Sequence, residues 1–137
     1  SPIYKEVYLK NMTNKTALKK MLETAKYNYD VGFWSSNSAE HAIRHEVGHA
    51  IQHWFTDNDV SKLNRISQIR DAIKKKCGIT VWSQNDTREH LKAAGDIISY
   101  YALYNDGELI AESVAEYMTG NPRDTAKEVV EILLGRR

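Results

Sequence analysis

Two histidines four residues apart, with a glutamate directly after the first, form the most constraining feature of this sequence. The segment is His45-Glu46-Val47-Gly48-His49. If it is helical, positions i and i+4 share one face, so both imidazoles can reach a single metal ion. The spacing therefore predicts a helix whose one face presents His45 and His49 as metal ligands.

The flanking residues also favour a helix, which we predict from about Ala39 to Phe55. Ser38, or Asn37 together with Glu40, can cap its start. Gly48 costs a helix about 1 kcal/mol relative to alanine, which suggests that another element approaches closely there. An apolar stripe is expected to face the core: Ala42, Ile43, Val47, Ala50, Ile51 and Trp54.

Zinc is the first choice for two imidazole ligands, and one Zn²⁺ ion is predicted, although cobalt or nickel could occupy the same site. Glu46 directly follows the first ligand, where its carboxylate can face a water molecule instead of the metal. A carboxylate in that position can remove a proton from the water as a general base.

His41 and His53 extend the i, i+4 row to four histidines. The row spans three turns, roughly 18 Å, which is too long for one ion. Only the middle pair is therefore assigned to the metal, and His41 and His53 are expected at the surface.

A catalytic zinc ion usually takes three protein ligands and leaves one position open for water. Glu108, Glu112 and Glu116 recur every fourth residue on one face of a predicted helix, beside apolar neighbours. One of these glutamates is expected to supply the third ligand.

The rest of the sequence predicts a single domain over residues 1–137, in the α+β class, mostly helical with a small N-terminal β-sheet. Strands are expected at Ile3–Leu9, Tyr27–Trp34 and Ile79–Trp82, because these runs are rich in apolar and aromatic residues. Further helices are expected over 14–26, 60–77, 86–101 and 108–118, with a last helix that starts at Asn121-Pro122.

The composition excludes several classes of protein. The net charge of +1 does not favour a nucleic-acid binder. The single cysteine, Cys77, excludes an internal disulfide. The sequence contains neither a signal-peptide pattern nor an apolar run long enough for a membrane span, so no membrane partner is predicted and a cytoplasmic location is slightly favoured. The oligomeric state is not predicted.

The two motifs together resemble a known family. His45-Glu46-Val47-Gly48-His49-Ala50, the segment Ser99-Tyr100-Tyr101-Ala102 and the later Glu108-Leu-Ile-Ala-Glu112 are similar to the gluzincins, zincin peptidases with a glutamate third ligand. The likeness is to the group of the anthrax lethal factor catalytic domain and to small zincin domains of phage and mobile-element proteins. It covers about residues 32–118.

This resemblance implies a zincin-like fold and a zinc-dependent endopeptidase. His45, His49 and Glu108 would bind zinc, and Glu46 would be the general base. Glu112 would accept a hydrogen bond from a ligand histidine, His45. The resemblance assigns no role to Glu116, which we expect at the surface.

The family spacing also selects Tyr101 as the residue that stabilises the oxyanion of the reaction. From the residues alone, Tyr100 and Tyr104 compete with it. The segment Gly32–Trp34 is expected to hold an extended peptide substrate by β-augmentation.

Two alternative functions are consistent with the same residues. The domain could be a catalytically inert zincin-like module, structural or interacting, of a phage or mobile-element protein. It could also be a toxin-type protease without its targeting parts. The intact set of ligands and Glu46 favours an enzyme that acts on a peptide or protein substrate.

Overall fold

The computed structural model describes residues 15–56, 59–81 and 85–137. Within these ranges the chain forms six α-helices, one 3-10 helix and no strand. The elements are α2 (Lys15–Asp30), α3 (His41–Thr56), α4 (Val60–Cys77), α5 (Arg88–Ile97), η1 (Tyr101–Leu103), α6 (Asp106–Tyr117) and α7 (Asp124–Leu133).

The predicted α+β class is wrong, because the described part of the chain is helical throughout. Tyr27 belongs to α2, which continues to Asp30. The amides of Phe33 and Trp34 then both donate to the carbonyl of Asn28, which closes the end of that helix instead of starting a strand. The predicted strand at Ile3–Leu9 lies outside the described residues.

The third predicted strand is also wrong as far as it is described. The Ile79 amide donates to the Lys74 carbonyl at the end of α4, where Gly78 adopts a left-handed conformation. Ile79 and Val81 are buried in the hydrophobic core. Their apolar character therefore reflects packing of a loop, which periodicity alone does not separate from a buried strand.

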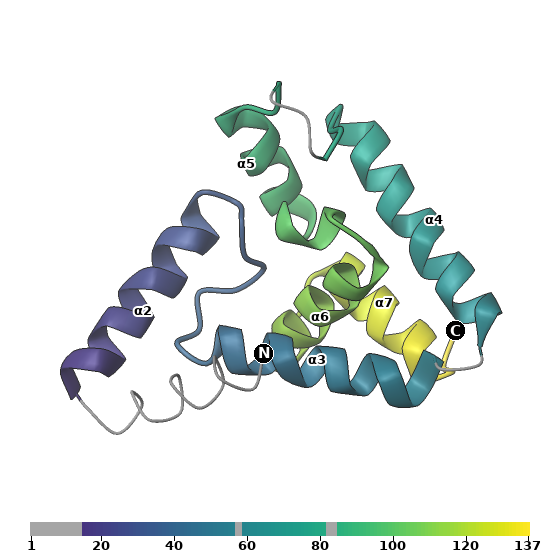
Figure 1. Cartoon of the computed structure of the whole chain (residues 1–137), viewed down its shortest axis with the longest axis horizontal. Helices are drawn as coiled ribbons and strands as arrows, with labels where there is room; N and C mark the ends of the chain where they lie inside the picture. Colours follow the sequence, from purple (N-terminus) through teal and green to yellow (C-terminus); the bar gives the residue numbers. More distant parts are fainter. Residues whose placement is uncertain (1–14, 57–58, 82–84) are drawn as a thin grey trace.

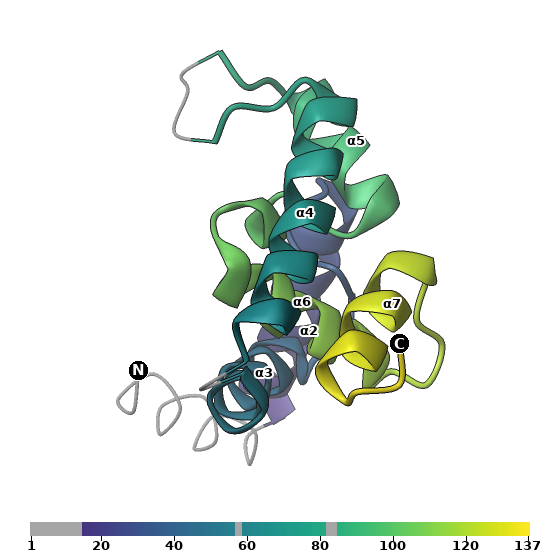
Figure 2. The same ribbon diagram turned by 90° about the vertical axis from the view of Figure 1, so that its right-hand side faces the viewer.

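Helix α6 forms the centre of the molecule, and α3, α4, α7 and η1 all pack against it. In Figure 1, α3 runs along one edge and α4 along another, with α6 and α7 between them. In the perpendicular view of Figure 2, α7 lies beside α4 and α6. Leu109 and Ile110 of α6 are fully buried in the core, which also takes in Ile98, Leu103 and Leu133.

The helix starts follow local capping chemistry. Asp59 accepts a hydrogen bond from the Lys62 amide and caps α4, whose bounds match the prediction. Asn105 caps α6 by accepting from the Glu108 amide, so this helix begins at Asp106, two residues before its predicted start at Glu108. Helix α7 begins at Asp124, two residues after the predicted position of Pro122.

The contact between α3 and α6 confirms the prediction that another element approaches Gly48. A Cβ atom at Gly48 would lie 2.6 Å from the Cα atom of Ala111 on α6. This close approach brings the histidine face of α3 against the glutamate face of α6.

Among the described helices, none is long and apolar enough to cross a membrane.

The buried face of α3 differs from the predicted apolar stripe. Val47 and Trp54 are exposed, whereas His41 and His45 are buried. Burial of imidazoles is favourable only when their nitrogens have partners, and Glu112 of α6 lies within hydrogen-bond distance of one nitrogen of each histidine.

Candidate metal centre

Three predicted ligands meet where α3 packs on α6. The Nε2 atom of His45 lies 2.9 Å from Oε2 of Glu108, and Nε2 of His49 lies 3.0 Å from Oε1 of the same carboxylate. One ligand atom from each residue lies within 4.8 Å of the others. The structure thus brings together the two histidines and the first glutamate of the predicted row.

The arrangement of these atoms fits a metal ion better than a hydrogen-bonded cluster. His45 Nε2 and Glu108 Oε2 are close, yet neither buried atom has a hydrogen-bond partner of acceptable geometry. Buried polar atoms without partners are rare and need an explanation. Ligand atoms of a tetrahedral zinc ion, with bonds of about 2.1 Å, lie roughly 3.4 Å apart. The separations found are only slightly shorter, so the three side chains could hold a tetrahedral ion such as zinc.

The other nitrogen of His45 faces Glu112. Its Nδ1 lies 2.7 Å from Oε2 of Glu112, a side chain that is fully buried. A proton on Nδ1 leaves the lone pair of Nε2 available to a metal, which is the usual effect of an outer carboxylate on a ligand histidine.

The Glu112 carboxylate has four hydrogen-bond donors around it. Oε1 accepts from the Ser35 amide at 3.0 Å and from the Ser99 hydroxyl at 2.9 Å. Oε2 faces His45 Nδ1 and His41 Nε2, each at 2.7 Å. A carboxylate has about four lone-pair sites, so this one is saturated.

His41, His45 and Glu112 are also close enough to form a second metal-binding group. Their facing atoms, however, are hydrogen-bonded to one another at 2.7 Å, in contrast to the partnerless atoms of the first group. The first group, His45, His49 and Glu108, is therefore the better candidate for a metal ion. The expectation that His41 lies at the surface is wrong, since only 1% of it is exposed, whereas His53 is exposed as predicted.

The ligands perturb each other's proton affinity. Burial alone would raise the pKa of Glu108, but the imidazoles of His45 and His49 outweigh it and lower the pKa to about 2. Burial alone would lower the pKa of His45, but the carboxylates of Glu108 and Glu112 raise it to about 9. A metal ion at His45 would therefore compete with a proton for this imidazole.

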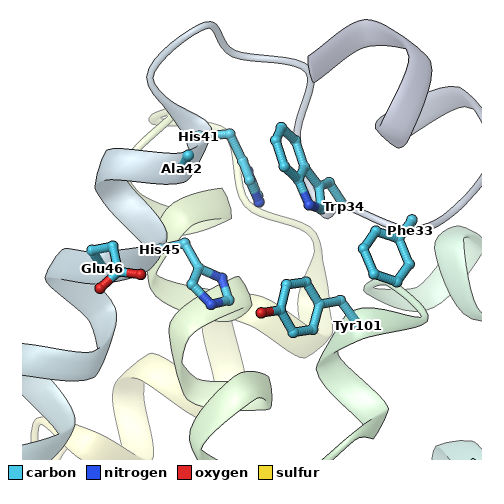
Figure 3. Close-up of a pocket in the computed structure, with 7 residues that line it drawn as sticks. All are labelled: Phe33, Trp34, His41, Ala42, His45, Glu46 and Tyr101. Atoms are coloured by element: carbon cyan, nitrogen blue, oxygen red, sulfur yellow. The ribbon is translucent and has the colours of Figure 1, made fainter. Parts of the chain in front are cut away.

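An open pocket of about 430 Å³ lies beside this centre. Figure 3 shows His45, Glu46 and Tyr101 around it, with the Tyr101 hydroxyl directed towards His45. Glu46 is half-buried and lines the pocket, but it belongs to neither group of possible metal ligands. The remaining wall is formed by Phe33, Trp34 and Ala42 together with the imidazole of His41.

Of the three tyrosines that competed on sequence, Tyr101 lines the pocket. Its ring stacks on His45, with centroids 5.0 Å apart. Burial, followed by the negative charge of Glu108, raises its pKa, so the hydroxyl keeps its proton. Tyr100 instead donates to Asp86, at 2.5 Å, away from this pocket.

Glu116 is buried, at 3% exposure, so its predicted surface position is wrong. Its carboxylate pairs with Arg123, whose Nη2 lies 2.7 Å from Oε1. The same guanidinium donates to the carbonyls of Gly95 and Ile98. The pair therefore ties the C-terminal end of α5 to the end of α6.

Gly32–Trp34 does not form the predicted strand for a substrate. The carbonyls of Gly32 and Phe33 accept hydrogen bonds from the amides of Tyr100 and Tyr101. Gly32 has a φ of 91°, and a Cβ there would lie 2.1 Å from the Leu91 carbonyl oxygen, so only glycine fits. These carbonyls therefore bind the backbone of Tyr100 and Tyr101 instead of a peptide substrate.

Sequence reasoning missed His41, Ser35 and Ser99 around Glu112. His41 belongs to the i, i+4 row, but that row is too long for one ion, so only its middle pair was assigned to the metal.

Comparisons of this chain with protein-family models, curated proteins and solved structures found no match.

Proposed function

We propose that this chain is a zinc-dependent endopeptidase, with His45, His49 and Glu108 as ligands. The observation that carries the proposal is the meeting of these three side chains beside an open pocket that Glu46 and Tyr101 also line. When bound, zinc supplies a Lewis acid that polarises the scissile carbonyl and lowers the pKa of water.

Glu46 is the general base in this proposal. It removes a proton from the attacking water, whose oxygen forms a bond to the peptide carbonyl carbon. The carbon–nitrogen bond then breaks, and Glu46 returns the proton to the leaving amine. Its place in the wall of the pocket, outside the predicted ligand set, supports this role.

Tyr101 supplies a hydrogen bond to the negative charge that develops on the carbonyl oxygen. A donor for this purpose must keep its proton, and the raised pKa of Tyr101 meets that condition. In Figure 3 its hydroxyl is directed towards His45, one of the proposed ligands. Such donors act strongly because they are already oriented before the reaction.

The decisive experiment compares the parent with Glu46→Gln, each loaded with one equivalent of zinc, on a broad peptide library. The variant should keep zinc and lose cleavage by a factor of about 10²–10⁴, the usual contribution of a general base. Glu23→Gln, an exposed change on α2, is the matched control and should cleave like the parent. Undiminished cleavage by zinc-loaded Glu46→Gln protein would exclude this mechanism.

A second candidate is a zincin-like module that binds a partner without cleavage. It is favoured by the internal hydrogen bonds of Gly32–Trp34, which occupy the segment expected to hold an extended substrate. This candidate predicts a parent protein that binds zinc and leaves the whole peptide library intact.

A further inference from the structure

His41 lies one turn before His45 on α3 and shares its carboxylate partner. Its Nε2 atom is 2.7 Å from Oε2 of Glu112, the same oxygen that lies 2.7 Å from His45 Nδ1. We propose that His41 is a positioning residue of the metal centre: it holds the Glu112 carboxylate so that His45 directs Nε2 towards the zinc ion. The inference rests on the proposed function, because it concerns the same zinc site.

His41 is itself held on two sides. Its Nδ1 atom lies 2.7 Å from the Ser36 hydroxyl, and its ring stacks on Trp34 with centroids 4.7 Å apart and planes at 20°. A neutral imidazole has one donor and one acceptor nitrogen. The ionised Glu112 carboxylate can only accept, so Nε2 of His41 is the donor to Glu112. In the neutral tautomer with this proton, Nδ1 accepts from the Ser36 hydroxyl.

The hydrogen bond from His41 explains why Glu112 does not turn towards the metal. With Ser35 and Ser99 on Oε1, and both histidines on Oε2, the carboxylate has no lone-pair site left for a cation. Without the His41 donor, Oε2 would keep one partner and could rotate into the ligand set. His41 therefore separates the outer glutamate from the inner one, Glu108.

In Figure 3 the His41 ring lies beside Trp34, on the same side of the pocket as His45. Neither nitrogen of His41 has a hydrogen-bonding site left for a substrate, since one faces Ser36 and the other Glu112. Its effect on the metal must therefore pass through Glu112 and His45.

Two matched substitutions test this role. The amide nitrogen of glutamine reaches about the position of imidazole Nε2, whereas that of asparagine reaches about the position of Nδ1. His41→Gln should therefore restore the donor to Glu112 and keep zinc affinity within about threefold of the parent. His41→Asn should bind zinc 10–100-fold more weakly, the usual effect of losing an outer partner.

Zinc affinity is measured by competition with a chelator, and thermal unfolding of the metal-free proteins checks that each variant is folded. Equal affinity of the asparagine and glutamine variants, whether high or low, would overturn the proposal. If His41→Asn does not fold, Ser36→Ala replaces it, since this change leaves the imidazole without its Nδ1 partner. A several-fold loss of affinity is then expected, and an unchanged affinity counts against the role.

A second measurement separates this inference from the proposed function. In metal-free protein, the Nδ1 proton of His45 should be protected from exchange with water, and nitrogen-15 NMR of the imidazole detects it. The signal should persist in His41→Gln and be lost in His41→Asn. A parent protein that binds no zinc would contradict the proposed function. The Nδ1 proton signal of His45 would still show whether His41 holds the Glu112 carboxylate against His45.

Discussion

His45 and Glu112 face each other across the contact between α3 and α6, with Nδ1 of the histidine 2.7 Å from Oε2 of the glutamate. The opposite nitrogen of the same imidazole faces Glu108 at 2.9 Å. One histidine thus links two glutamates that are one helical turn apart on α6. Glu112 has a full set of donors, and Glu108 does not, so the two carboxylates have different roles.

The first prediction follows from this difference. Glu108→Ala should bind zinc more than about 100-fold more weakly than the parent, because the loss of a ligand exceeds the 10–100-fold effect of an outer partner. Metal content by mass spectrometry after dialysis against micromolar zinc measures the change. Glu23→Ala on the exposed face of α2 is the control. One full equivalent of zinc in Glu108→Ala protein would remove Glu108 from the ligand set.

The second prediction concerns pH. The pKa of His45 is raised from 6.5 to about 9 by its two carboxylate neighbours, so zinc must displace a proton at neutral pH. Zinc affinity should therefore rise by roughly 16-fold between pH 7.5 and 9, with the slope flattening as the pH approaches the pKa. Calorimetry in buffers of different ionisation enthalpy should count about one proton released per zinc ion at pH 7.5.

The metal-free protein should show the opposite dependence. A raised folded-state pKa stabilises the protein fully below the unfolded value of 6.5, and this contribution is lost as pH rises through about 9. The unfolding temperature without zinc should thus fall between pH 6.5 and 9.

A zinc affinity that stays constant from pH 7.5 to 9 would contradict the prediction of proton displacement, because it would show that His45 carries no proton in this range.

Sequence reasoning located most helices because their capping residues and apolar spacing are local signals. It predicted α4 within its observed bounds, since Asp59 and Gly78 mark both ends. It failed at Tyr27–Trp34, where aromatic residues suggested a strand although α2 extends to Asp30 and its end is closed by the Asn28 carbonyl.

At the candidate metal site, too, local sequence signals predicted only part of the arrangement. Spacing alone brought His45 and His49 together, and the family resemblance singled out Glu108 from a row of three glutamates. The burial of His41 and Glu116 depends on partners distant in sequence. His41 pairs with Glu112. Glu116 pairs with Arg123, which in turn contacts the carbonyls of Gly95 and Ile98. No local pattern of apolar and polar residues encodes such pairs, so both were expected at the surface.

The third prediction distinguishes among the tyrosines. Tyr101→Phe should keep zinc and KM but lower kcat about 10²–10³-fold, as expected when one donor to an oxyanion is removed. Tyr104→Phe is the matched control, because this residue packs against Tyr101 but does not line the pocket. Steady-state kinetics on one cleaved peptide measures both variants. A large loss in Tyr104→Phe with an active Tyr101→Phe would assign the oxyanion donor to Tyr104.

The last prediction tests the helix contact on which the metal site depends. Alanine favours a helix over glycine by about 1 kcal/mol, so Gly48→Ala would stabilise an isolated α3. In the protein, however, the new Cβ would meet backbone atoms of Ala111, with 2.6 Å to Cα and 3.0 Å to the carbonyl oxygen. Backbone cannot move aside as a side chain can, so α3 and α6 must separate.

Overpacking of this kind typically costs about 1–3 kcal/mol, and we expect Gly48→Ala to lower the free energy of unfolding by about that amount. Zinc affinity should fall with it, because the ligands lie on both helices. Gly107→Ala is the matched control on α6, where the nearest atom to a new Cβ is the flexible Gln52 side chain at 3.0 Å. Urea unfolding of the metal-free proteins compares the two. A Gly48→Ala protein as stable as Gly107→Ala would mean that the two helices pack less closely than the structure has them.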